Sequence, residues 1–183
     1  MRRQSRYNQA VFLLLLIEGY NVIPPVAPPG RGADDHWLHR ERMQLIDRLW
    51  QHLDDRVRRR TCVVFDARQP PRDRSARYEL KDIRVWFAVG YPEADDLLEE
   101  IIAAHSAPKQ LAVVSSDHRV QAAARRRGAT AFDSDVWLDQ LMDGKVRLAP
   151  SVQAKISGEG QGSGDAKPEV DGDVDGWMEE FGF

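Results

Sequence analysis

Cysteine is almost absent from this chain of 183 residues, in which Cys62 is the only example. A single cysteine allows no internal disulfide and excludes a zinc site built on several cysteines. The sequence also lacks a glycine-rich phosphate loop and a dinucleotide-binding fingerprint. We therefore expect a protein of a reducing, cytoplasmic setting that does not use the usual nucleotide-binding motifs.

A long hydrophobic run is lacking as well. The apolar stretch VFLLLLI at residues 11–17 follows several arginines and so imitates a secretion signal, but it ends at Glu18 without a small-residue cleavage site. It is far too short to span a bilayer. We interpret it as a buried first strand and expect no membrane association.

Acidic residues are concentrated near the C-terminus. The net charge is −3, yet the segment after Ile156 holds eight acidic residues and one basic residue, Lys167. The rest of the chain has 25 lysines and arginines against 21 acidic residues, a net charge of +4. Nearly all of these cations are arginines, which suit bidentate contacts with phosphate. A cationic body is common among nucleic-acid-binding proteins, although many other proteins share it.

Predicted strands and helices alternate along the chain. Strands are predicted at residues 11–17, 61–65, 83–88, 111–114 and 130–132. Helices are predicted at 34–57, 92–102, 117–127 and 134–142, with caps at Asp34 or Asp35, Ser116 or Asp117, and Ser134. The polar segment 67–82 is predicted to be an exposed loop. This order predicts an α/β fold with a parallel sheet and right-handed crossovers.

One domain with two extensions is predicted. Residues 1–10 form an N-terminal extension, residues 11–150 form the domain, and residues 151–183 form an acidic, glycine-rich flexible tail. The tail ends in WMEEFGF, which either docks on a protein partner or folds back on the domain.

Acidic residues follow the ends of four predicted strands. Glu18 follows the first strand, Asp66 the second, Asp95 and Asp96 begin the helix after the third, and Asp117 lies just beyond the fourth. The functional crevice of an open α/β sheet lies beyond the carboxyl ends of its strands. Carboxylates that meet there raise each other's pKa, and a divalent cation such as Mg²⁺ or Mn²⁺ neutralises them. Such a site can hydrolyse a phosphodiester.

Each of these acidic residues also has a simpler interpretation. Taken alone, each is a helix cap or a solvated loop residue, and Asp117 is especially well placed as a cap. The metal-site hypothesis therefore depends on their joint placement at one edge of the sheet.

Four ordered strings, LLLIEGYNVI, VVFDA, YPEADDLLEEII and VVSSDHRVQ, resemble the YacP-like branch of the NYN family, the PIN-related ribonucleases. The resemblance spans roughly Val11 to Met142. It implies a PIN-like three-layer fold, with a mostly parallel central sheet flanked by helices, and a metal-dependent endoribonuclease activity.

The resemblance also implies site residues. The family's metal-ligating acids fall on Glu18, Asp95 and Asp117, with Asp96 beside them as a further catalytic residue and Asp66 at the edge of the site. Glu18 is a departure, because the family's motif is usually Asp-Gly-Tyr-Asn. The extra methylene moves the carboxylate outward, and metal sites tolerate little displacement of a ligand. Glutamate nevertheless ligates Mg²⁺ as readily as aspartate does.

Supporting roles are predicted for several polar residues. Asn21, which matches the Asn of the family's motif, could hold Glu18 or a metal-bound water, or could simply form a turn. Ser115 and Ser116 could orient a water or a phosphate, or cap the next helix. Cations of the 67–82 loop would lie beside the acidic residues and contact RNA phosphates, unless nearby acids balance them: Arg68, Arg72, Arg74 and Arg77.

We therefore predict an endoribonuclease that acts on single-stranded or structured RNA, in RNA processing or mRNA decay, with Mg²⁺ or Mn²⁺. The main alternative is a catalytically weakened module of the same fold that binds RNA, a ribosome or another ribonucleoprotein without cleavage. In a third hypothesis the tail recruits a protein partner and the domain serves as a scaffold.

Overall fold

A computed structural model describes residues 12–23, 37–67, 70 and 75–159. Its centre is a six-stranded sheet in the order β3-β4-β2-β1-β5-β6. Neighbouring strands are parallel except β3 and β4, which are antiparallel. The strands are β1 (Leu15–Glu18), β2 (Thr61–Phe65), β3 (Arg77–Leu80), β4 (Ile83–Phe87), β5 (Ala112–Val114) and β6 (Thr130–Phe132). The predicted mostly parallel α/β sheet is confirmed.

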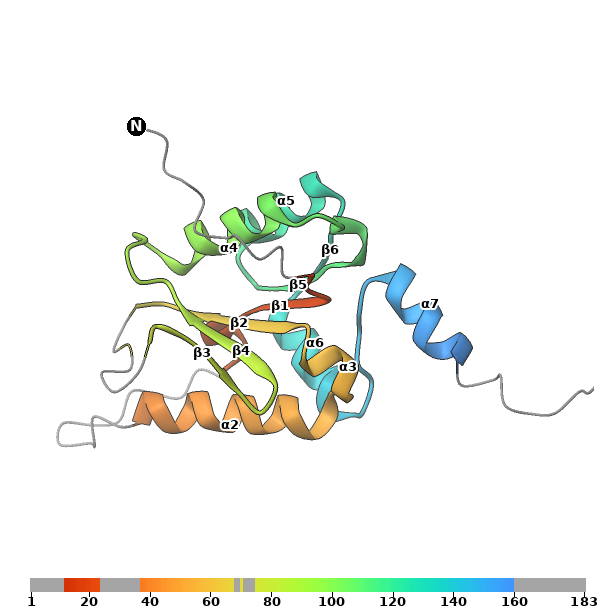
Figure 1. The fold of residues 1–183 in the computed structure, drawn as a ribbon, viewed down its shortest axis with the longest axis horizontal. Helices are drawn as coiled ribbons and strands as arrows, with labels where there is room; N and C mark the ends of the chain where they lie inside the picture. The colour runs from red at the N-terminus through yellow and green to blue at the C-terminus, as the bar shows by residue number, and fades with distance from the viewer. Residues whose placement is uncertain (1–11, 24–36, 68–69, 71–74, 160–183) are drawn as a thin grey trace, which may run out of the picture.

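Helices cover both faces of the sheet and complete a three-layer fold (Figure 1). Two of them, α2 and α6, lie on one face, and α4 and α5 lie on the other. None of the helices in the described ranges is long and apolar enough to cross a membrane. The helices are α1 (Gly19–Val22), α2 (Trp37–His52), α3 (Asp55–Arg58), α4 (Ala94–Ala104), α5 (His118–Arg127), α6 (Ser134–Met142) and α7 (Pro150–Glu159).

The position of β1 in the sheet explains why apolar and polar residues do not alternate in its sequence. Leu15 and Ile17 pack into the core beneath the sheet with α2 and α6, whereas Leu16 packs into the second core with α4 and α5. A central strand of a parallel sheet is covered on both faces, so every position is apolar. Side chains alternate along a strand, and Glu18 therefore continues the Leu16 face.

The prediction of an exposed loop at 67–82 is wrong for its last part. Residues Arg77–Leu80 form β3, which pairs with β4. The two strands are joined by Lys81 and Asp82, whose φ angles are 53° and 61°. Positive φ at both central residues is the geometry of the tight hairpin turn that Asn-Gly usually provides. Because Lys-Asp carries no such signal, the hairpin was not predicted.

The single helix predicted at 34–57 is two helices. Helix α2 ends at His52, and Asp54 then begins α3 by accepting a hydrogen bond from the amide of Val57 at 2.9 Å. Asp54 competes with the continuing helix because its side chain satisfies an amide at the new start. The caps predicted at Asp34 and Asp35 lie outside the described residues.

The helix after β5 agrees with its prediction. Asp117 caps α5 through the amides of Arg119 and Val120, and Gly128 ends it in the left-handed region at φ 79°. One cap was misassigned. Asp133, rather than Ser134, accepts from the first amides of α6.

Helix α7 lies in the segment where the tail was predicted to begin. It spans Pro150–Glu159, and Val152, with 5% of its surface exposed, joins the core beneath the sheet. The packed structure thus extends past residue 150, the predicted end of the domain. The N-terminal extension at residues 1–10 and residues 160–183 lie outside the described ranges.

Candidate acidic site

Glu18 is the last residue of β1 and immediately precedes α1. Its side chain is partly buried, and its Oε2 accepts a short hydrogen bond from Ser115 Oγ. Burial raises the pKa of Glu18 to about 7; the Ser115 hydrogen bond opposes this rise, and the charges of Asp95, Asp117 and Asp66 add to it. Four acidic residues from distant parts of the sequence therefore act on one another at the carboxyl edge of the sheet.

Ser115 connects the strand ends. It is fully buried just after β5, and besides donating to Glu18 its Oγ accepts from the Asp117 amide at 2.9 Å and from Asn21 Nδ2 at 3.5 Å. Its carbonyl accepts from Gln121 Nε2 at 2.7 Å. Ser115 thus holds Glu18 directly, and Asn21 holds Ser115 rather than Glu18. Neither the Ser115–Glu18 bond nor the contact of Gln121 was predicted from the sequence.

Asp95 lies in the first turn of α4 and is partly buried. Burial raises its pKa most, followed by the charges of Asp117 and Glu93, and the Arg119 guanidinium opposes the rise. Aspartate near a helix N-terminus is favoured by the helix dipole. The raised pKa therefore reflects burial and crowding by other carboxylates.

Asp117 and Asp66 both accept hydrogen bonds from backbone amides, Asp117 from two and Asp66 from one. Asp117 Oδ1 accepts from the amides of Arg119 at 2.6 Å and Val120 at 3.2 Å. Asp66, after β2, accepts from the Ala94 amide at 3.1 Å and so ties the end of β2 to the start of α4. The simple interpretation of Asp117 as a helix cap is correct, and the cap also places its charge beside Glu18 and Asp95.

Asp96 faces a different partner from Asp95. Its Oδ1 accepts from Arg119 at 2.6 Å, and the same guanidinium binds Glu99 at 2.7 Å and lies 3.9 Å from Glu93. Arg119 therefore joins the first turns of α4 to α5. Sequence reasoning missed this residue, because an arginine two positions after an acid has no distinctive spacing.

Ser116 has a different role from Ser115, which donates to the Glu18 carboxylate. Its Oγ accepts from the Ser134 amide at 3.3 Å and so supports the start of α6. Ser134 Oγ is buried and has no hydrogen-bond partner among the described residues.

Gly19 is required by packing. A Cβ at this position would lie 2.2 Å from the Phe65 ring. That ring contacts Tyr20 edge-to-face, with 5.1 Å between the ring centroids. Glycine at this position is therefore explained by the close approach of Phe65 from β2, and Tyr20 packs against the core.

The carboxylates fit a hard cation in donor type but are not arranged around one. Within the described residues, no group of three or more His, Cys, Asp or Glu side chains is placed to hold a metal ion. Glu18 is turned toward Ser115, and Asp66 and Asp117 each direct an oxygen at backbone amides. Carboxylate oxygens suit Mg²⁺ or Mn²⁺, and the repulsion among these groups favours a neutralising charge. The carboxylate side chains would have to rotate before their oxygens could surround one cation.

Of the four predicted RNA-binding arginines, only Arg77 is described. It lies in β3 with its guanidinium over the Trp86 ring, 4.5 Å from the centroid. Arg68, Arg72 and Arg74 lie outside the described residues, and their role stays a prediction.

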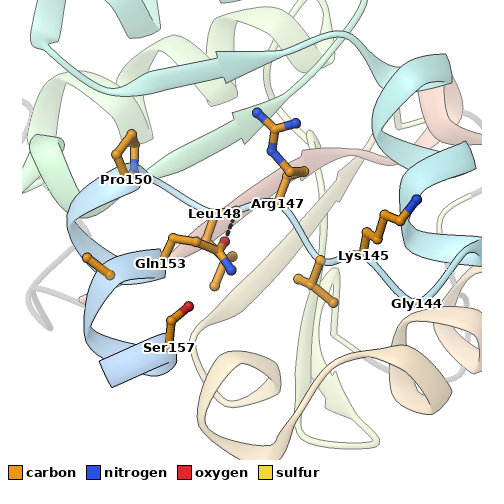
Figure 2. Close-up of a pocket in the computed structure, with 9 residues that line it drawn as sticks. Gly144, Lys145, Arg147, Leu148, Pro150, Gln153 and Ser157 are labelled. Atoms are coloured by element: carbon orange, nitrogen blue, oxygen red, sulfur yellow. Dashed lines mark hydrogen bonds between the residues drawn. The ribbon is translucent and has the colours of Figure 1, made fainter. Parts of the chain in front are cut away.

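A separate pocket of about 720 Å³ lies between the α6–α7 connection and α7 (Figure 2). Lys145 and Arg147 lie on the connection and Gln153 and Ser157 on the helix, and Gln153 accepts from the Leu148 amide at 3.1 Å. None of the predicted site residues lines this pocket. The acidic site is therefore on another part of the molecule.

Comparison with known proteins agrees with the fold. A family model, the YacP-like NYN domain, matches residues 15–166. The crystal structure of Rae1 (YacP) from Bacillus subtilis is similar with a TM-score of 0.54 and 21% identity, over 80% of this chain and 80% of that chain. A tryptophan-to-leucine mutant of Rae1 gives a TM-score of 0.52 and 22% identity, over 80% and 85%. A comparison with curated proteins finds no match. Because the family model covers most of the sequence, the chain belongs to the YacP-like NYN domain family.

Proposed function

We propose that the protein is an endoribonuclease that cleaves RNA phosphodiester bonds with the help of Mg²⁺ or Mn²⁺. Its family is nuclease-like and PIN-related, which supports an RNA-related nuclease function. The observation that carries the finer proposal is that Glu18 lies partly buried beside Asp95, Asp117 and Asp66, where its burial and then their charges raise its pKa. Carboxylates that crowd one another in this way are expected where a cation binds.

In this proposal Glu18, Asp95 and Asp117 hold the cation. A bound divalent cation supplies a polarised water and stabilises the negative charge that develops on the phosphodiester. Ser115 orients Glu18 and also binds the Asp117 amide, and Asn21 holds Ser115. Asp66 fixes the start of α4, which carries Asp95.

Asp96 is proposed to act indirectly. Its pairing with Arg119 fastens α4 to α5, so that Asp95 and Asp117 stay on the same side of the sheet. Ser116 supports the neighbouring helix through the Ser134 amide.

Cleavage of a labelled single-stranded RNA, with and without added Mn²⁺, tests the proposal. We expect cleavage with Mn²⁺, none with a chelator, and a loss of at least a hundred-fold in Asp117→Asn, in line with the size of single electrostatic contributions to catalysis. Asparagine is as good a helix cap as aspartate, so this change removes the charge and keeps the cap. The matched control is Asp54→Asn, which alters another capping aspartate, at α3. Unchanged cleavage in Asp117→Asn would overturn the assignment.

A second candidate function is RNA binding without cleavage. Two observations favour it: the described residues hold no ready-made group of metal ligands, and Glu18 is engaged by Ser115. If the wild type binds RNA but does not cut it with Mn²⁺, Glu18→Asp provides the deciding comparison. Cleavage gained in that variant would mean that the glutamate had weakened a working site.

A further inference from the structure

We propose that Arg77 and Trp86 form a binding patch for unpaired RNA, on which a nucleobase stacks beside the acidic site. This patch, the Arg77–Trp86 pair, lies on β3 and β4. The proposal rests on the proposed function for its link to cleavage, whereas the binding itself can be measured separately. It assigns a role to Trp86, a residue that the sequence analysis did not single out.

The sheet register places this pair level with the acidic site. Glu18 is the neighbour of Val64, Val64 is the neighbour of Trp86, and Trp86 is the neighbour of Arg77. These four positions form one row across β1, β2, β4 and β3. Adjacent strands are about 4.8 Å apart, so Trp86 lies on the order of 10 Å from Glu18 along the row.

The members of the row also share one face of the sheet. Val64 belongs to the core beneath α4 and α5, and Trp86 packs against the edge of that core. Glu18 continues the same face of β1 from Leu16. Stacked nucleotides advance roughly 3.4 Å each along a strand, so roughly three of them connect the two places. A strand with its scissile phosphate at Glu18 would therefore reach Trp86.

Exposure differs sharply between the two faces of β4. Val85 and Phe87 are buried under α2, whereas Trp86 on the opposite face is only partly buried, as is Arg77 beside it. Helix α4 packs on β1 and β2, farther along this face. An aromatic ring that retains contact with water at the edge of a site is a common feature of single-strand binding surfaces.

The chemistry of the pair selects unpaired RNA. The Arg77 guanidinium, 4.5 Å above the centre of the Trp86 indole, offers with it a cationic surface on which a base can stack, and its charge attracts the adjoining phosphate. Base faces are hidden within a duplex and become accessible only in single strands, loops or bulges. The patch would therefore position unpaired nucleotides next to the carboxylates.

Binding of a fluorescently labelled oligouridine in the presence of a chelator tests this inference without cleavage. Stacking of one base predicts that Trp86→Leu weakens binding about ten-fold or more, while Trp86→Phe retains most of the affinity. Arg77→Gln should weaken binding and reduce its dependence on salt. A duplex of the same length should be insensitive to all three changes.

Trp50→Leu is the matched control. Trp50 is 44% exposed on α2, on the other face of the sheet, and it also carries a cation, Lys81 Nζ, 4.8 Å from its ring centroid. It should bind oligouridine like the wild type. Thermal unfolding of each variant shows whether weaker binding comes from a lost contact or from unfolding of the protein. If Trp86→Leu does not fold, the inference is tested with Trp86→Phe and Arg77→Gln.

The outcomes separate this inference from the proposed function. Wild-type affinity in Trp86→Leu and Arg77→Gln would overturn the patch even if the protein cleaves RNA. Equal sensitivity of duplex binding would also overturn it, because the partner would not be unpaired RNA. Weaker oligouridine binding in both variants would support the patch even if no cleavage is found.

Discussion

Glu18 and its neighbours show what single residues contribute at this site. The positions of the acidic residues could be predicted, because strand ends in a parallel sheet converge at one edge. Their hydrogen bonds could not. Ser115 hydrogen-bonds to Glu18, and Arg119 pairs with Asp96 rather than with Asp95. Both contacts join segments that are far apart in the sequence. Such choices depend on side-chain geometry that no local pattern encodes.

The raised pKa of Glu18 predicts a dependence of stability on pH. Its pKa rises from the ordinary value of 4.5 to about 7, so the folded protein binds this proton more tightly than the unfolded chain does. Without metal, the contribution of Glu18 to stability should fall as pH rises from about 4.5 to about 7 and remain low above it. The effect is at most about 3 kcal/mol, and solvent screening of this partly exposed group reduces it.

Glu18→Gln tests this sign directly. The neutral amide removes the cost of burying a charge and then the repulsion from Asp95, Asp117 and Asp66, so in a chelator the variant should unfold at a higher temperature than the wild type at pH 8. The difference should vanish below pH 4.5, where Glu18 is protonated in both the folded protein and the unfolded chain. A variant less stable than the wild type at pH 8 would contradict the account.

Gly19→Ala should destabilise the protein by about 2 to 3 kcal/mol, the cost of overpacking a core. The new methyl group would lie 2.2 Å from the Phe65 ring. Urea unfolding measures the loss. The double variant with Phe65→Leu should lose less than the sum of the single changes, because the ring that causes the clash is gone. Simple additivity would show that the contact is not responsible.

Secondary-structure elements were predictable where their signals are local. Helix α5 has a capping aspartate and a terminal glycine, and it agrees with its prediction. Strand β3 was missed because its existence depends on pairing with β4, and its turn lacks glycine. The break between α2 and α3 was missed because apolar spacing continues through Leu53 and Val57, both buried in the same core.

Asp82→Gly should stabilise the β3–β4 hairpin. Asp82 has a φ of 61°, a region that costs most side chains on the order of 1 kcal/mol and that glycine occupies freely. We expect a gain of up to about 1 kcal/mol, measured by urea unfolding. Glu79→Gly, in the extended part of β3, is the control and should lower stability. A loss of stability in Asp82→Gly would mean that the turn is not strained.

At the scale of the whole molecule, the described residues form one sheet with a core on each face. The family resemblance seen in four short strings extends over most of this structure. The family match to residues 15–166 reaches beyond the span of roughly Val11 to Met142 that the strings suggested. The sequence pattern placed the end of the domain too early because α7 has no strong apolar stripe, although its Val152 is buried. The role of the terminal WMEEFGF stays a prediction.

Two truncations test where the packed structure ends. Removing residues 160–183 should leave the melting temperature and the proposed cleavage activity essentially unchanged. Ending the chain after Ala149 removes α7 and should cost about 1.5 to 3 kcal/mol, the value of burying a side chain such as Val152. Thermal unfolding and RNA cleavage measure both effects. If removal of residues 160–183 abolished cleavage but left stability unchanged, the tail would have a part in the activity.

The central claim is that Glu18, Asp95 and Asp117 share a cation, and a calorimetric titration of the metal-free protein with Mn²⁺ tests it most directly. The account predicts saturable binding near neutral pH that weakens at least ten-fold in Asp117→Asn and is unchanged in Asp54→Asn. It also predicts weaker binding at pH 5, where Glu18 keeps its proton. Absence of Mn²⁺ binding in the wild type, or equal affinity in Asp117→Asn, would contradict it.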